Sequence, residues 1–194
     1  PIGEWLIHNV CNQTKIWQDA GYKDFYTSIN ISINQLIQPD FVSKLLKSLA
    51  ENDLHPSSIE LEVTEGAIEQ DVNTAITRMQ ELRTHGLKLS IDDFGTGRSS
   101  LIYLKQLPID TLKIDHYFVH NIDKDRQKSA ITKGIIEMAH NLNLQVVAEG
   151  VETKAELNIV KALKCDKTQG YLLSHPLPVS EFEELLLTNI RLIA

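Results

Sequence analysis

Hydrophobic positions along the 194-residue chain alternate between two spacings. Stretches with an apolar residue at every third or fourth position predict amphipathic helices, and short apolar runs between them predict buried strands. The predicted strands lie at 26–31, 59–63, 87–91, 111–115, 144–148 and near 169–171. The predicted helices run from the start to about 21 and then cover 41–49, 72–82, 100–107, 131–142, 153–163 and 179–192. Trp5 and Trp17 are expected to pack the first helix against the strands, and Ile131 to begin the apolar stripe of the helix at 131–142.

Strands that alternate with helices indicate an α/β fold with a parallel sheet. A doubly wound sheet and a barrel both fit this count. The barrel is favoured because no glycine-rich phosphate-binding turn follows the first strand, and because polar residues end nearly every strand, where barrel active sites lie. A complete (β/α)8 barrel takes roughly 250 residues. Since the chain opens inside a helical pattern, we expect residues 1–194 to form a single domain, a TIM-like barrel incomplete at its N-terminus and lacking its first strands.

Composition narrows the class of protein. Hydrophobic residues make up 42% and charged residues 23%, as in soluble globular domains, and no apolar run reaches the length of about 18 residues that spans a membrane. A net charge of −7 without a basic block argues against a nucleic acid polymer as ligand. Cys11 and Cys165 lack the spacing of a metal site or disulfide framework. We expect a cytoplasmic domain and leave open a membrane anchor in a longer parent protein.

Polar side chains stand at or just beyond the strand ends: Asn30, Glu62, Asp92, Asp93, Lys113, Asp115, Glu149, Glu152 and Gln169. One such acid is usually a helix cap or a surface charge, but acids at strand end after strand end indicate a site. Converging carboxylates repel one another unless hard divalent cations neutralise them. The adjacent pair Asp92-Asp93 suits two ions about 3.5–4 Å apart, which can hold a hydroxide and stabilise the leaving oxygen of a phosphodiester. Lys113 adds a point charge for that water or a phosphate oxygen.

Six segments contain these residues: Ser-Ile-Asn-Ile-Ser at 28–32, Glu-Val-Thr-Glu at 62–65, Asp-Asp-Phe-Gly-Thr-Gly-Arg-Ser-Ser-Leu at 92–101, Leu-Lys-Ile-Asp at 112–115, Ala-Glu-Gly-Val-Glu-Thr at 148–153 and Gln-Gly-Tyr at 169–171. In order and spacing they resemble the motifs of the EAL-domain cyclic di-GMP phosphodiesterases. The resemblance covers nearly the whole chain, and six ordered motifs are far more specific than Asp-Asp-Phe-Gly alone.

The resemblance implies a role for each matching residue. Asn30, Glu62 and Asp92 match ligands of one metal ion, and Asp93 matches a ligand of the second. The catalytic matches are Lys113, which contacts the attacking water, Glu149, an acid proposed as general base, and Gln169, which orders the water network. Glu65 matches a glutamate that anchors the loop from Phe94 to Ser100, which couples the metal site to dimerisation, and Glu152 matches a supporting residue.

The implied reaction opens cyclic di-GMP to the linear dinucleotide with two Mg²⁺ or Mn²⁺ ions, and Ca²⁺ inhibits it because it accepts looser coordination. The implied partners are a second copy in a homodimer and sensory or GGDEF domains of a bacterial signalling protein. The Glu-Ala-Leu segment that names the family, with a nearby arginine, is not within this sequence, so we expect the isolated chain to be inactive or nearly so. Arg98 stands where the family often has an aromatic residue.

Two other functions stay open. A non-catalytic receptor for cyclic di-GMP, or a protein-docking module, would use the same barrel without hydrolysis. A metal-dependent hydrolase of another phosphodiester would keep the chemistry and change the substrate. A Glu-Ala-Leu segment upstream in the parent gene would favour the phosphodiesterase. Within the chain, Asp92, Asp93, Lys113 and Glu149 favour an enzyme.

Overall fold

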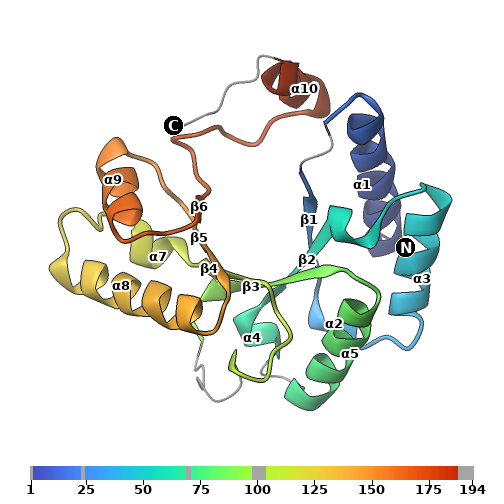
Figure 1. Cartoon of the computed structure of the whole chain (residues 1–194), viewed down its shortest axis with the longest axis horizontal. Helices are drawn as coiled ribbons and strands as arrows, with labels where there is room; N and C mark the ends of the chain where they lie inside the picture. The colour runs from blue at the N-terminus through green and yellow to red at the C-terminus, as the bar shows by residue number, and fades with distance from the viewer. Residues whose placement is uncertain (1, 23–24, 69–70, 98–103, 188–194) are drawn as a thin grey trace. The chain divides into compact units, whose positions relative to one another are not determined.

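The computed structural model describes residues 2–22, 25–68, 71–97 and 104–187 (Figure 1). Its strands form a six-stranded sheet in chain order: β1 (Thr27–Asn30), β2 (Ile59–Thr64), β3 (Lys88–Phe94), β4 (Thr111–Ile114), β5 (Gln145–Ala148) and β6 (Lys167–Thr168). The helices are α1 (Ile2–Asp19), α2 (Ile33–Leu36), α3 (Phe41–Glu51), α4 (Glu65–Ile68), α5 (Val72–Thr84), α7 (His116–Val119), α8 (Arg126–Asn141), α9 (Lys154–Ala162) and α10 (Val179–Leu187), with a 3-10 turn at Pro56–Ser58. No helix among the described residues combines the length and the apolar character needed to cross a bilayer.

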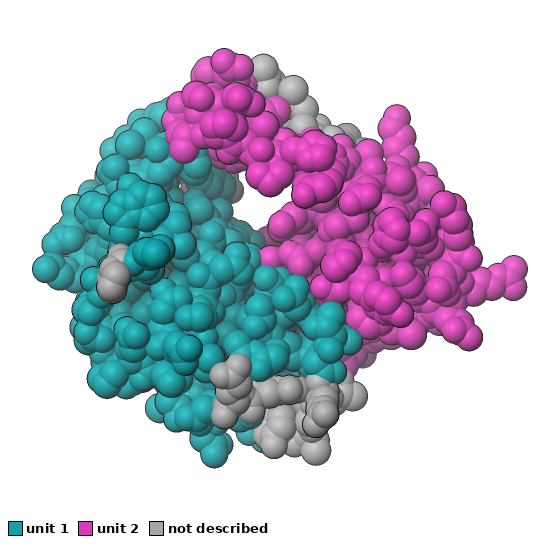
Figure 2. Space-filling view, turned by 180° about the vertical axis from the view of Figure 1, so that it is seen from behind, with its two compact units in different colours: residues 1–112 teal, residues 113–194 magenta. Residues whose placement is uncertain are grey.

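The chain divides into two compact units, Pro1–Leu112 and Lys113–Ala194, coloured separately in Figure 2. The boundary falls within β4, whose first two residues belong to unit 1 and whose last two belong to unit 2. Strands β1, β2 and β3 therefore lie in unit 1, and β5 and β6 lie in unit 2.

Unit 1 is built on three parallel strands. β1 pairs with β2, and β2 pairs with β3, so that Asn30 lies opposite Glu62 and Thr64 lies opposite Asp92. Helix α5 packs on β3 and α3, and α1 packs on α3 and β1. The core contains completely buried side chains from the strands and helices: Leu45, Leu61, Met79, Leu82 and Leu89. Each such side chain contributes about 1.5–3 kcal/mol of burial free energy, which holds the strands in register.

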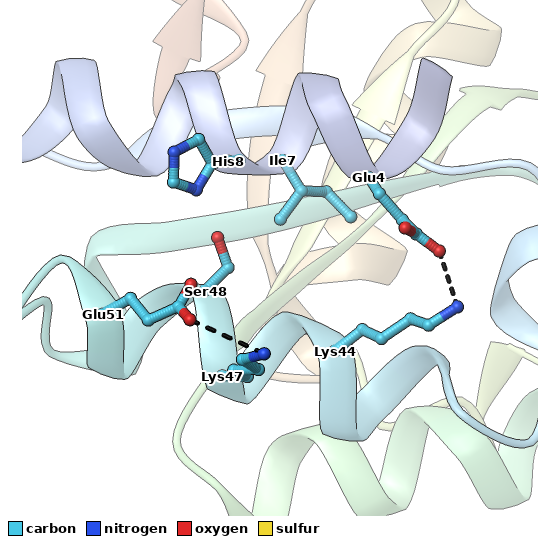
Figure 3. A pocket seen from close by; sticks show the side chains of 7 residues that line it. All are labelled: Glu4, Ile7, His8, Lys44, Lys47, Ser48 and Glu51. Carbon is cyan, nitrogen blue, oxygen red and sulfur yellow. Dashed lines mark hydrogen bonds and ion pairs between the residues drawn. The ribbon is translucent and has the colours of Figure 1, made fainter. Parts of the chain in front are cut away.

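A pocket of about 270 Å³ lies between α1 and α3 (Figure 3). Its lining residues are Glu4, Ile7, His8, Lys44, Lys47, Ser48 and Glu51. The Lys44 ammonium lies 2.6 Å from a carboxylate oxygen of Glu4 and 2.6 Å from one of Asp40, and Lys47 pairs with Glu51 at 3.7 Å. Of these exposed pairs, Lys44 with Glu4 joins the two helices, whereas the other two lie along α3, and solvent screens all three.

Unit 2 contains the parallel pair of β5 and β6, with Val147 opposite Lys167 and Ala148 opposite Thr168. Helix α8 packs on β5 and on α7. Asp125 caps α8 by accepting hydrogen bonds from the backbone N–H groups of Gln127 and Lys128, which explains why the helix begins before the predicted position 131.

The prediction that Trp5 and Ile131 pack against the core is wrong. The Trp5 residue is 65% exposed, because the buried stripe of α1 runs through Ile7, Cys11 and Thr14 on another side of the helix. Ile131 is 49% exposed, because Thr132, Ile135, Ile136 and Ala139 form the buried face of α8. Helical spacing places apolar residues on a stripe but does not decide which of two neighbouring stripes meets the core.

Trp17, by contrast, packs against another side chain, with its ring centroid 5.7 Å from that of Phe25. The remaining differences concern the bounds of elements. Strand β6 lies two residues before the predicted 169–171, and Gln169 continues its ladder through a backbone N–H bond to Ala148. In the predicted helix at 100–107, residues 100–103 lie outside the described residues, and Leu104 is the one helical residue of the described part, 104–107. The end of the last predicted helix, 188–192, also lies outside the described residues.

Candidate functional site

Unit 1 brings Asn30, Glu62 and Asp92 to one face of its sheet. Asn30 and Glu62 are direct partners across β1 and β2, and Glu62 lies opposite Ser90, two residues before Asp92. Because side chains two apart along a strand share a face, these three point to the same side. Glu62 and Asp92 are both buried. Two buried carboxylates beside an amide oxygen make a set of hard oxygen donors.

A further group of polar side chains lies on the same face, two residues nearer the N-terminal ends of the strands. The buried Glu60 carboxylate accepts hydrogen bonds from the Ser28 hydroxyl at 3.0 Å and the Thr111 hydroxyl at 2.9 Å. Glu60 stands two residues before Glu62, so this layer supports the acids above it. We did not predict Glu60, although its spacing from Glu62 is a signal that the sequence carries.

Asp93 lies in β3, one residue before the strand ends. Its φ of 55° lies in the left-handed region, which Asp tolerates better than most residues. The Asp93 backbone N–H donates to Asp92 Oδ1 at 3.1 Å, and the Thr96 hydroxyl donates to the Asp93 carbonyl at 2.9 Å. The two adjacent carboxylates therefore lie among the last three residues of β3, next to a hydrogen-bonded turn.

Glu65 fixes the loop that follows. Its buried carboxylate accepts the backbone N–H groups of Gly95 at 2.8 Å and Gly97 at 3.4 Å. At Gly97, an added Cβ would lie 2.9 Å from Glu65 Cδ, so any side chain there would have to displace the Glu65 carboxylate. The loop residues from 98 onward, including Arg98, lie outside the described part of the chain.

Unit 2 contains an ion pair between two predicted catalytic residues. The Lys113 ammonium lies 2.7 Å from Glu149 Oε1, and their side chains are 5% and 15% exposed. The Glu149 backbone N–H donates to the Ile114 carbonyl at 3.1 Å, which sets the end of β5 beside β4. A close pair of opposite charges with little access to water interacts more strongly than a surface pair.

A pocket of about 350 Å³ in unit 2 holds three of the predicted residues together. Glu149, Glu152 and Gln169 line it with His116, His120, Gly150, Gly170 and Tyr171. Gln169 is held at its backbone, where its carbonyl accepts the Val151 N–H at 3.0 Å. Gly150 has a φ of 68°, and an added Cβ there would lie 2.6 Å from His116 Cβ, so this wall of the pocket depends on a bare backbone.

Glu156 holds the loop that carries Glu149 and Glu152, and sequence reasoning missed it. Its Oε2 accepts the backbone N–H groups of Glu152 and Thr153, each at 3.0 Å, and its Oε1 accepts that of Asn121 at 2.8 Å. Burial opposes ionisation of this carboxyl, but the hydrogen bonds outweigh it and hold the pKa of Glu156 below its usual range. The Thr-x-x-Glu capping box at the start of α9 was the available signal.

The donor set of unit 1 fits a divalent cation of the magnesium class. Asn30, Glu62, Asp92 and Asp93 offer only carboxylate and amide oxygens, which Mg²⁺ and Mn²⁺ prefer over softer ligands. Both cysteines are free thiols: Cys11 is buried in α1, and burial raises the pKa of the Cys165 thiol to about 11.

Comparison with known proteins identifies relatives along almost the whole chain. The EAL domain family profile matches residues 1–176. The bifunctional diguanylate cyclase/cyclic di-GMP phosphodiesterase MucR of Pseudomonas aeruginosa is 39% identical over 180 residues, which are 93% of this chain and 26% of MucR. The chain thus spans about a quarter of the length of this relative.

Solved structures of EAL proteins share the fold. The cyclic di-GMP complex of the MucR phosphodiesterase has a TM-score of 0.89 at 39% identity, over 93% of this chain and 73% of that one. The EAL domain of Mycobacterium smegmatis DcpA has a TM-score of 0.92 at 36% identity, over 97% and 85%. The manganese complex of Klebsiella pneumoniae BlrP1 with cyclic di-GMP has a TM-score of 0.74 at 34% identity, over 78% of this chain and 39% of that one. The calcium complex of BlrP1 with cyclic di-GMP has a TM-score of 0.80 at 30% identity, over 88% of this chain and 43% of that one.

These matches confirm the predicted α/β class and the TIM-like barrel of EAL type. The strand order β1 to β6 in chain order is the order that such a barrel requires. With its six motifs, its fold and a family profile that covers residues 1–176, the chain belongs to the EAL domain family.

Proposed function

We propose that this domain hydrolyses cyclic di-GMP to the linear dinucleotide. Water adds across one phosphodiester bond, the attacking oxygen joins phosphorus, and the leaving 3′ oxygen takes up a proton. The observation that carries the proposal is the ion pair of Lys113 and Glu149 at 2.7 Å, because it combines a proton acceptor and a proton donor at a strand end. Relatives named as cyclic di-GMP phosphodiesterases support the choice of substrate.

The roles follow from charge and reach. Glu149 accepts the proton of the attacking water, and Lys113 donates a hydrogen bond to that water and faces the charge that develops on the phosphate. Gln169 orders the water beside them, and Glu152 supports this set. We propose that Asn30, Glu62, Asp92 and Asp93 serve as metal ligands.

Divalent ions complete the proposal. Two Mg²⁺ or Mn²⁺ ions, when bound, would polarise the attacking water and stabilise the leaving oxygen. Support comes from two structures of BlrP1 with cyclic di-GMP, one with manganese and the other with calcium. Ca²⁺ is expected to support binding of cyclic di-GMP but to inhibit its hydrolysis, because the larger Ca²⁺ ion takes more ligands in a less regular geometry.

We also propose a setting for the domain. Residues 1–194 form a single EAL domain of a larger signalling protein, since MucR joins a phosphodiesterase to a diguanylate cyclase and the chain spans 26% of it. The loop that Glu65 holds contributes to a homodimer. The two free thiols suit the reducing cytoplasm.

The test is conversion of cyclic di-GMP to the linear dinucleotide in Mn²⁺, measured by chromatography. The chain is compared with a version extended upstream along its parent gene. Conversion by either version supports the proposal, and conversion by the extended version alone locates a missing ligand upstream. Binding of cyclic di-GMP without conversion by either version would establish a receptor in place of an enzyme.

A further inference from the structure

Ser90 stands in the same row of unit 1 as two of the proposed metal ligands. The register of β1, β2 and β3 places Asn30 opposite Glu62 and Glu62 opposite Ser90. Because residues two apart along a strand share a face, Ser90 also lies on the face of Asp92. Neighbouring strands of a sheet run about 4.7–4.9 Å apart, so Ser90 is the next side chain to Glu62 on β3. A short hydroxyl side chain therefore adjoins the two buried carboxylates of this face.

The Ser90 hydroxyl is buried without a hydrogen-bond partner among the described residues. The residue is 0% exposed, so its hydroxyl does not reach bulk water either. Buried hydroxyl groups are nearly always hydrogen-bonded, because a donor that leaves water without finding an acceptor destabilises the fold. An unpaired donor at this position therefore points to a state of the protein in which an acceptor meets it.

Three carboxylates on this face could accept the hydroxyl of Ser90, and their contacts distinguish them. Each oxygen of Glu60 already accepts a hydroxyl group, one from β1 and one from β4. Asp92 lies on the same strand as Ser90, and its Oδ1 accepts the backbone N–H of the next residue. Glu62 faces Ser90 directly across the two strands. Glu62 is therefore the acceptor that the register favours.

We propose that Ser90 is a positioning residue of the metal site, whose hydroxyl donates a hydrogen bond to the Glu62 carboxylate when Glu62 binds a divalent cation. The inference rests on the proposed function, from which it takes Glu62 as a ligand. A carboxylate has about four acceptor sites on its two oxygens, so it can bind a cation and accept a hydroxyl together. Hydrogen bonds of this kind orient metal ligands, and their loss weakens metal binding by about 10- to 100-fold. Ser90 thus acts through Glu62 and is not itself a ligand.

The test is Mn²⁺ binding without nucleotide, followed by electron paramagnetic resonance, on the domain extended upstream along its parent gene. Ser90→Ala should lower the affinity for Mn²⁺ about tenfold. The melting temperature of the metal-free Ser90→Ala protein should stay the same or rise, because an unpaired buried donor has been removed. Ser48→Ala makes the same change to a buried serine on α3 (Figure 3) and should leave the affinity for Mn²⁺ unchanged.

The combination of weaker Mn²⁺ binding and undiminished stability in Ser90→Ala supports the inference, since a purely structural serine would not produce it. Unchanged Mn²⁺ affinity in Ser90→Ala overturns it, and so does an equal loss in Ser48→Ala. A metal-free Ser90→Ala protein that melts well below the unmodified one assigns the hydroxyl to the fold and also overturns it.

The proposed function is tested apart from this inference. An unmodified protein that binds Mn²⁺ but does not hydrolyse cyclic di-GMP overturns the proposed reaction, while the role of Ser90 is still decided by the Mn²⁺ titrations. An unmodified protein that does not bind Mn²⁺ overturns the assignment of the metal ligands and the role of Ser90 together.

Discussion

Lys113 is the residue at which binding and catalysis can be separated. Its ammonium is bound to Glu149 at 2.7 Å and almost removed from water, so its charge is fixed in place before any substrate arrives. An interaction that strengthens as the phosphate gains charge lowers the barrier, whereas one already complete in the bound substrate only lowers KM. The proposed role assigns Lys113 to the first kind.

Lys113→Ala should therefore lower kcat far more than it raises the Kd for cyclic di-GMP. A loss of about a hundredfold in kcat is expected for one donor that faces developing charge. Steady-state kinetics in Mn²⁺ and binding in Ca²⁺ measure the two effects separately. If affinity falls by the same factor as turnover, Lys113 is a phosphate clamp and not a catalytic group.

A substitution at Gly150 tests whether the wall of the unit 2 pocket leaves room for a side chain. Gly150→Ala adds a methyl group 2.6 Å from His116 Cβ at a backbone φ of 68°, so both the contact and the conformation become unfavourable. We expect a loss of at least about 1 kcal/mol of unfolding free energy from the left-handed backbone and more from the clash. Denaturant unfolding measures this loss.

Gly134 supplies the matched control. It lies within α8, and nothing stands within 4 Å of an added Cβ. Gly134→Ala should stabilise the protein by about 0.5–1 kcal/mol, because alanine is the better helix former. Equal effects of the two substitutions would contradict the structural account of the Gly150 wall.

The start of α9 is the element on which the loop from Glu149 to Glu152 depends. Glu156 lies in the first turn of the helix and binds three backbone N–H groups, from Asn121, Glu152 and Thr153. The ionised carboxylate makes these bonds, and the pKa of Glu156 is lowered in the folded protein. The stabilisation is therefore complete above the unfolded-state pKa of about 4.3 and is lost as the pH falls through the lower folded pKa.

Glu156→Gln should reduce the unfolding free energy by about 2 kcal/mol at pH 7, since hydrogen bonds to a charged group are replaced by neutral ones. The difference between the two proteins should shrink as the pH falls below about 4, because the wild-type carboxyl then gains its proton. Urea unfolding from pH 7 to pH 3 measures both quantities, with Glu181→Gln as the reference. A difference that does not change with pH would show that the charge of Glu156 does not stabilise the fold.

The elements themselves were largely predictable, and the failures have physical causes. Long helices such as α5 and α8 repeat their apolar residues over several turns, so their existence is evident from spacing. Helices of four residues, such as α2 and α7, contain about one turn and show no period. The wrong placement of Trp5 has another cause, because the choice between stripes of α1 depends on tertiary contacts.

At the scale of the whole molecule, the order of the motifs predicted the family, and the family profile over residues 1–176 confirmed it. Single motifs could not have done so, because Asp-Asp-Phe-Gly occurs outside this fold. The buried layer of Glu60, Ser28 and Thr111 was missed, since the two-residue spacing of Glu60 and Glu62 also fits an exposed strand face until the neighbouring strands are known. That these polar residues stand at strand ends was predictable, because the carboxyl ends of parallel strands lie at the same edge of a sheet.

The most direct measurement of the central claim is Mn²⁺-dependent hydrolysis of cyclic di-GMP by the domain extended upstream along its parent gene, with and without Asp92→Asn. Asp92 is buried on the same sheet face as Asn30 and Glu62, so the amide should weaken metal binding and lower turnover at least about a hundredfold. Asp123→Asn, an exposed aspartate of unit 2, should hydrolyse at the wild-type rate. Near-normal turnover by Asp92→Asn would contradict a metal-dependent phosphodiesterase built on these acids.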